Sequence, residues 1–203
     1  MKTSFKSLLA LTLTALVLST SVFTSNAVAA DKNPSGVFAP LSTFNKIVVS
    51  GNVKLTLVQR SRQDISVNGE FDRTKISFKQ KGYTLFVNST DSEPLEVTIA
   101  VTDLQRIDAS KGAQVTTSGK FNLEVLQVFL EDNATANVKA TINSLYTVTK
   151  DISDLKLAGT ANEHIIVKNR NSMLDTEKFA ALRTEMTNSD TGIAANTKTV
   201  LVK

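Results

Sequence analysis

The chain has 203 residues, a formal net charge of +4, one histidine, and neither cysteine nor tryptophan. The lack of cysteine excludes disulfides and a cysteine-linked lipid, and a single histidine leaves almost no material for a histidine-based metal site or a Ser-His-Asp triad. The basic residues are scattered instead of gathered with aromatic residues between them, which argues against a nucleic-acid partner.

Residues 1–30 have the pattern of a secretory signal peptide. Lys2 and Lys6 precede an apolar run from Leu8 to Leu18, and the small residues of Ala27-Val28-Ala29 fit a cleavage site. The apolar run is shorter than the roughly 20 residues of a membrane span, and no later segment is apolar enough to cross. We expect an exported protein, periplasmic or at the cell surface, that is not an integral membrane protein and whose charge falls from +4 to +2 on cleavage.

The segment 31–43 contains proline, serine and glycine without apolar alternation, which predicts a linker. From Phe44 onward short alternating runs begin, so residues 44–203 are expected to form one domain. Ile47-Val48-Val49 leads to a corner at Gly51-Asn52, where glycine can adopt a positive φ at no steric cost. Further strands and turns are predicted up to the regular alternation of Leu95–Val101, including turns at Asn68-Gly69 and Lys81-Gly82.

From Leu104 to Asn171 the alternation recurs at an interval of about 20 residues, which stacked coils of a solenoid require. Turns are expected after the first two repeats, at Lys111-Gly112 and Asp132-Asn133. The recurring residues are Ile107, Val128, Tyr146, Ile165 and, more weakly, Thr184. The pattern predicts an all-β, single-domain β-solenoid, similar to a right-handed parallel β-helix, with a strand-rich section at its N-terminus.

Three further patterns bear on this region. Asn122, Asn143 and Asn162 recur at similar places, as in an asparagine ladder bonded from coil to coil, although asparagine is also common in turns. The apolar spacing between Asp175 and Asn188 fits one face of a helix, but the segment also continues the coil register, which we favour. Thr199–Val202 is apolar enough to be a closing strand.

Two segments resemble a known family. Phe44–Gln59 resembles the opening of the head GIN domain, a family labelled "putative auto-transporter adhesin" and found in Bacteroidetes-type envelope proteins, and Leu95–Ser110 is similar to its central segment. The chain departs from the family at Ser50-Gly51-Asn52, where the family has Gly-Ile-Asn, and in lacking Ser-Gly-Ser corners in its later coils. The resemblance implies a β-solenoid with an adhesive or envelope role, and it supplies no catalytic residues.

Few residues suggest a site. Asp132, Asp151 and Asp154 fall near successive corners, where stacked acids could meet a sugar, and Tyr146 is a candidate for stacking on a ring. Their spacing matches neither an EF-hand nor a repeated calcium-binding motif, so no metal is predicted, and no cofactor motif occurs. Acids at turns are usually solvent-exposed and need no ligand. The single histidine, His164, is expected at the surface or in a turn.

These observations favour a non-catalytic secreted or cell-envelope module. Its partner is expected to be a cell-surface glycan or an envelope protein, bound by a flat sheet face rich in threonine, serine, asparagine and lysine through many weak contacts. Two alternatives stay open: a carbohydrate-active enzyme that uses the corner acids, and a purely structural envelope component. The oligomeric state is open as well.

Overall fold

The computed structural model describes residues 42–69 and 71–190. The predicted signal peptide 1–30, most of the linker 31–43 and the predicted strand Thr199–Val202 lie outside these residues. The described part has no helix, and therefore none with the length and hydropathy of a membrane span. Its strands are β1 (Lys46–Gly51), β2 (Val53–Gln59), β3 (Asp64–Asn68), β4 (Ile76–Lys81), β5 (Thr84–Ser89), β6 (Leu95–Val101), β7 (Arg106–Ser110), β8 (Gln114–Ser118), β9 (Asn122–Leu130), β10 (Thr135–Thr149), β11 (Asp154–Lys168) and β12 (Met173–Asn188).

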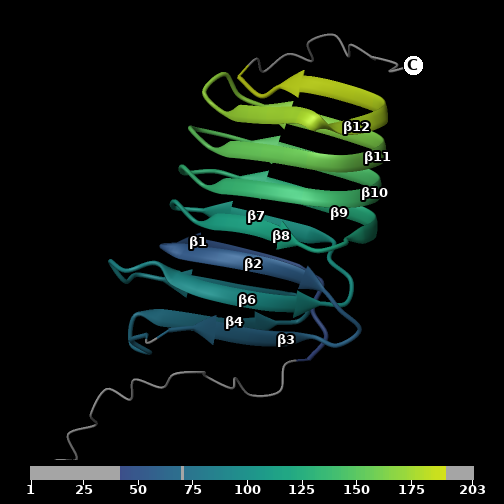
Figure 1. Ribbon diagram of the computed structural model, residues 1–203. Coiled ribbons are helices and arrows are strands. Elements are labelled where there is room, and N and C mark those ends of the chain that lie inside the picture. The colour runs from purple at the N-terminus through teal and green to yellow at the C-terminus, as the bar shows by residue number, and fades with distance from the viewer. Residues whose placement is uncertain (1–41, 70, 191–203) are drawn as a thin grey trace, which may run out of the picture.

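The twelve strands of the described residues form one mixed sheet that is curled into two walls (Figure 1). The first wall contains β3, β6, β2 and β8, and the second wall contains β4, β5, β1, β7 and β9, each in that order. β10, β11 and β12 run through both walls, because their N-terminal halves continue from β8 and their C-terminal halves from β9. Neighbouring strands are parallel, except that β3 pairs antiparallel with β6 and β4 with β5.

Side chains that point between the walls form the core, as the period-two alternation predicts. A column of the second wall, at most 3% exposed, runs through Ile107, Val128, Thr147 and Ile166. The sequence interval placed Tyr146 and Ile165 in this column, and that assignment is wrong by one residue. These two side chains pair with each other in the adjacent, outward column.

The one-residue error in the predicted column arises at the corner between the walls. β8 and β9 are separate strands joined by residues 119–121, whereas the matching parts of β10 form one continuous strand. The segment from Gln114 to its partner Thr135 is therefore two residues longer than the segment from Thr135 to its partner Asp154. Because alternate residues face opposite sides of a sheet, an error of one residue exchanges the core for the surface.

The order of the strands in the walls differs from their order in the chain. β1 and β2 lie between β5 and β6 on one side and β7 and β8 on the other. The N-terminal section is rich in strands, as predicted, but backbone hydrogen bonds join it to the repeat region as part of the same walls. Antiparallel β3 and β4 end the walls at the bottom of Figure 1.

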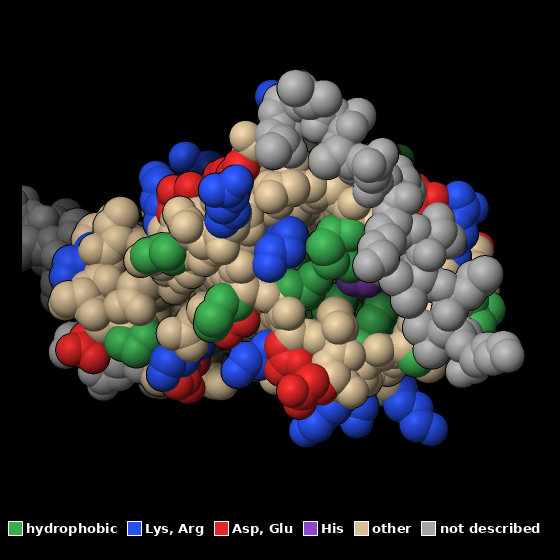
Figure 2. Space-filling model, turned by 90° about the horizontal axis from the view of Figure 1, so that it is seen from above, with side chains coloured by type: hydrophobic (Ala, Val, Ile, Leu, Met, Phe, Trp, Pro, Cys, Tyr) green, Lys and Arg blue, Asp and Glu red, His purple; other side chains and the backbone are tan. Residues whose placement is uncertain are grey.

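β12 occupies the segment that also fitted a helix. It pairs in parallel with β11, with a bulge opposite Lys156 and Ala158. The segment is therefore a strand in register with β11, and the helical interpretation is wrong. Phe179 packs against the core from β12, whereas Leu182 is 65% exposed. Seen from above, hydrophobic side chains and the histidine are visible in the middle of the molecule (Figure 2).

Gly51, at the corner between β1 and β2, is constrained in two ways. Its φ is +80°, and a Cβ at this position would lie 1.9 Å from the carbonyl oxygen of Ser89. Gly82, in the turn between β4 and β5, also has a positive φ, +56°, but a Cβ there would enter open space. A comparison of substitutions at the two glycines therefore distinguishes the effect of backbone strain, which both share, from that of a steric clash, which only Gly51 has.

We expect Gly51→Ala to destabilise the fold more than Gly82→Ala. Strain at a positive φ costs about 1–3 kcal/mol in both variants. At Gly51 the backbone must also move away from Ser89. Urea unfolding followed by circular dichroism measures both free energies, and equal losses would contradict the close contact.

Candidate binding surfaces

The three acidic candidates do not converge on a site. Asp132 and Asp151 occupy equivalent turns, before β10 and before β11, with φ of 51° and 56°. Asp154 begins β11 in the first wall, where it pairs with Thr135 and is partly exposed. Among residues 42–69 and 71–190, no group of three acidic or histidine side chains is placed to hold a metal ion.

Asp151 makes a hydrogen bond within the fold, which gives this residue a structural role. Its Oδ2 accepts a hydrogen bond from the backbone N–H of Asp132 at 3.3 Å. The contact recurs two turns further on, where Oδ2 of Asp190 accepts from the backbone N–H of Arg170 at 2.8 Å. In both cases a carboxylate binds the backbone of the preceding turn and so holds two successive turns together.

Tyr146 lies on the outer face of the second wall, in a cluster that sequence reasoning missed. Its ring centroid is 5.8 Å from that of Phe129, and the guanidinium carbon of Arg106 lies 4.0 Å from the Phe129 centroid. Nε of Arg106 also donates to both carboxylate oxygens of Asp108, at 2.8 and 3.0 Å. The alternation of Arg106 and Asp108 along β7 was a signal in the sequence, but Phe129 joins them only through the pairing of β7 with β9.

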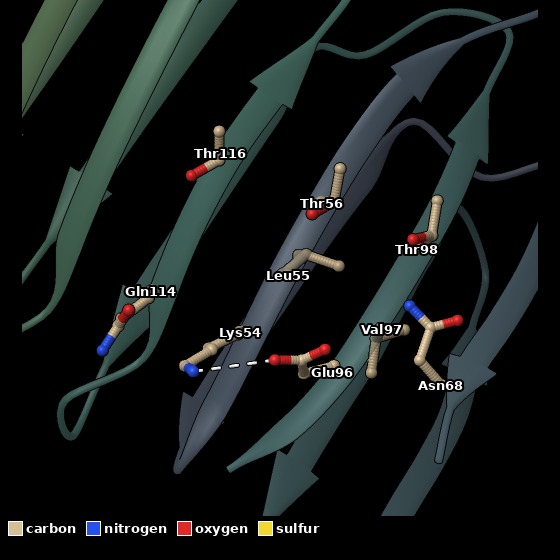
Figure 3. A pocket seen from close by; sticks show the side chains of 9 residues that line it. All are labelled: Lys54, Leu55, Thr56, Asn68, Glu96, Val97, Thr98, Gln114 and Thr116. Carbon is tan, nitrogen blue, oxygen red and sulfur yellow. Dashed lines mark ion pairs between the residues drawn. The ribbon is translucent and has the colours of Figure 1, made fainter.

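The outer face of the first wall carries a column of polar side chains in register. Thr98, Thr56 and Thr116 lie side by side on β6, β2 and β8, as Figure 3 shows. Ser66 and Asn137 continue the column at its two ends. Because neighbouring strands are about 4.8 Å apart, the hydroxyl groups repeat at that spacing.

A second polar column runs beside the threonines. Its members on β3, β6, β2 and β8 are Asn68, Glu96, Lys54 and Gln114. Nζ of Lys54 is 3.6 Å from Oε1 of Glu96, and the two side chains are 48% and 55% exposed. An exposed ion pair contributes little to stability, so both groups remain available to a ligand. The two columns line an open depression of about 290 Å³ (Figure 3).

The asparagine ladder is present in part, at the exposed corner between the walls. Nδ2 of Asn162 donates to Oδ1 of Asn143 at 2.7 Å, and Nδ2 of Asn143 donates to Oε1 of Glu124 at 2.5 Å. Asn122 does not belong to the ladder, because it pairs with Thr141 and Glu124 takes the expected place. The two extra residues at the corner between β8 and β9 cause this shift as well.

His164 is buried, which corrects its expected surface position. It is 1% exposed, its Nε2 lies 2.9 Å from Oγ1 of Thr147, and its ring meets Phe179 edge-on at 5.4 Å. Burial disfavours the charged imidazolium and lowers the pKa of His164 from 6.5 to about 4. In the sequence, His164 lies two residues before Ile166 on the same strand, and this spacing was the signal that both side chains face the core.

The described residues form an all-β protein, a curled sheet whose two extended outer faces are its candidate binding surfaces. The chain belongs to the family described as "Putative auto-transporter adhesin, head GIN domain", whose model matches residues 43–198. No match was found among functionally curated proteins.

Three crystal structures of similar proteins show the same fold. A "putative adhesin" from Bacteroides fragilis is 18% identical, with 73% of this chain and 72% of that chain covered and a TM-score of 0.66. A "putative adhesin" from Parabacteroides merdae is 13% identical, with coverage of 76% and 78% and a TM-score of 0.62. A "putative lipid binding protein" from Parabacteroides distasonis is 11% identical, with coverage of 77% and 80% and a TM-score of 0.55.

Acidification is expected to destabilise the folded protein through His164. The unfolded chain binds this proton with a pKa near 6.5 and the folded chain only near 4, so the stability from this group is complete above about pH 6.5 and is lost progressively down to about pH 4. The loss is on the order of 3 kcal/mol.

The free energy of unfolding as a function of pH, for wild type and His164→Gln, measures this effect. Glutamine can still bond Thr147 but does not titrate, so its profile should lack the loss between pH 6.5 and 4. A variant profile as steep as that of the wild type would disprove the assignment.

Proposed function

We propose that this protein is a non-catalytic, exported module of the cell envelope that binds a glycan or an envelope protein through the outer face of its first wall. The column formed by Thr98, Thr56 and Thr116 carries the proposal, because it places equivalent hydroxyl groups in register on an open surface. The family description and the adhesin names of two similar structures support an adhesive role. The signal-peptide pattern of residues 1–30 supports export to the periplasm or the cell surface.

We also infer that the domain 44–203 is a β-solenoid related to the right-handed parallel β-helix, preceded by the signal peptide 1–30 and the linker 31–43. The equal intervals between Thr135, Asp154 and Met173, which pair in succession, support this inference. Each coil then covers the apolar interior of the coil below it.

The threonine face is suited to an extended ligand. Each hydroxyl can both donate and accept a hydrogen bond, and the β-branched side chain has few χ1 rotamers. The binding groups are therefore largely ordered before a ligand arrives, which reduces the entropy lost on binding. Single contacts of this kind are weak, so affinity comes from several coils that contact one glycan chain or one protein segment.

The triple variant Thr56→Val, Thr98→Val and Thr116→Val is expected to lose binding at least tenfold. Valine keeps the shape and strand preference of threonine but removes the hydroxyl group. Binding of the labelled mature protein to a glycan array and to purified surface proteins of its own cell envelope measures the loss. Thr84→Val, on the outer face of the second wall, is the matched control and should change binding less than twofold.

Two outcomes would overturn this proposal. Release of a new reducing or unsaturated sugar end, abolished by Asp151→Ala, would instead identify a carbohydrate-active enzyme. Lack of binding to glycans and to surface proteins, together with an envelope defect on deletion, would identify a structural component.

A further inference from the structure

The outer face of the second wall carries a second depression, of about 240 Å³, with a different chemistry. One outward column along its floor contains Val48, Asp108, Phe129 and Val148 in that order, so Phe129 and Val148 form an apolar pair and Val48 lies beyond Asp108. Val48 and Phe129 are half-buried, and Val148 is 7% exposed. An apolar pair of this kind on an outer sheet face can contact the C–H face of a ligand ring.

Charged side chains lie on both sides of this column. Arg106 lies two residues before Asp108 on β7, so both point to the same face. Glu131 and Lys150 follow Phe129 and Val148 by two residues each and line the opposite side of the depression. The lining therefore combines two cations and two carboxylates with apolar contact area.

Arg106 is held in place by contacts of Nε and of its guanidinium face, and among residues 42–69 and 71–190 no hydrogen bond reaches its terminal nitrogens. Asp108 binds Nε, and Phe129 lies under the guanidinium plane with its carbon 4.0 Å from the ring centroid. Arg183 on β12 provides a contrast, because its Nη1 is 3.6 Å from Glu163 and its Nη2 is bonded to Glu185. A guanidinium fixed through Nε and through its face presents Nη1 and Nη2 as a preorganised fork, which matches a planar carboxylate.

We propose that this depression binds the carboxylate-bearing sugar unit of an acidic glycan. The carboxylate accepts from Nη1 and Nη2 of Arg106, the C–H face of the sugar ring lies against the neighbouring Phe129 and Val148, and the hydroxyl groups bond to Glu131 and Lys150. This surface is distinct from the threonine column of the first wall. The proposal therefore goes beyond the proposed function and stands or fails independently of it.

The charges of the lining favour a sugar acid over a phosphate group. Arg106 and Lys150 are balanced by Asp108 and Glu131, so a dianion meets two carboxylates that repel it. A single carboxylate on a ring rich in hydroxyl groups uses the cations and the acids at once, because the acids accept hydrogen bonds from hydroxyl groups.

Isothermal titration of the mature protein with uronic-acid oligosaccharides tests the site. The panel contains galacturonate, glucuronate and mannuronate oligomers, each beside its carboxyl-reduced neutral counterpart. At least one acidic member should bind, at least tenfold more tightly than its neutral counterpart. Arg106→Gln should weaken that binding at least tenfold, and Arg106→Lys should weaken it as well, because lysine keeps the charge but loses the fork.

Two variants serve as controls. Arg183→Gln removes an arginine of the same wall whose terminal nitrogens are already paired, and it should change affinity less than twofold. The triple threonine-to-valine variant of the first wall should also bind the acidic sugar normally. Circular dichroism and the melting temperature establish that each variant is folded.

Three results would overturn the assignment. These are lack of binding to every acidic member at millimolar concentration, equal affinity for the acidic and neutral forms, and an Arg183→Gln loss as large as that of Arg106→Gln. Displacement of the bound sugar by an equal concentration of inorganic phosphate would show a general anion site and would also reject the sugar assignment.

Discussion

The backbone hydrogen bonds between neighbouring parallel strands of the walls are the constraint on which the rest of this structure depends. They determine which residue lies above which, and the alternation of side chains then assigns each column to the core or to an outer face. Val128 and Phe129 show the consequence, because one is buried between the walls and its neighbour belongs to the cluster with Arg106 on the second wall. Core and binding surfaces therefore follow from a single register.

The core itself changes along the walls. It is apolar around Ile107 and Val128, but the part formed by β10, β11 and the turn before β12 buries His164 bonded to Thr147, and Thr149 bonded to Ser172 at 2.9 Å. Buried polar groups are tolerated when they have partners, and here the partners come from different strands or turns. The neutral state of His164 has the same origin, since a protonated ring would be buried without a compensating carboxylate among its described contacts.

The two outer faces are free of the packing demands that shape the core, and they differ accordingly. The first wall presents small hydroxyl groups at regular spacing, which suits an extended partner with repeated hydrogen-bonding groups. The second wall presents Phe129 and Arg106 beside aliphatic side chains, which suits a single planar, charged unit. The position of β1 and β2 between strands from later in the chain means that both faces are completed only by contacts distant in sequence.

The alternating pattern by itself determined the all-β class, the strands, the corner at Gly51 and a recurrence of about 20 residues, because these depend on local periodicity and backbone preference. Local pattern also favoured β12 as a strand, and the structure agrees. Only the tertiary structure decided the one-residue offset of Tyr146, the place of Glu124 in the ladder, the burial of His164 and the cluster of Arg106 with Phe129. Each of these depends on how many residues turn the corner between the walls and on which strands become neighbours, and a periodic pattern in the sequence does not contain that information.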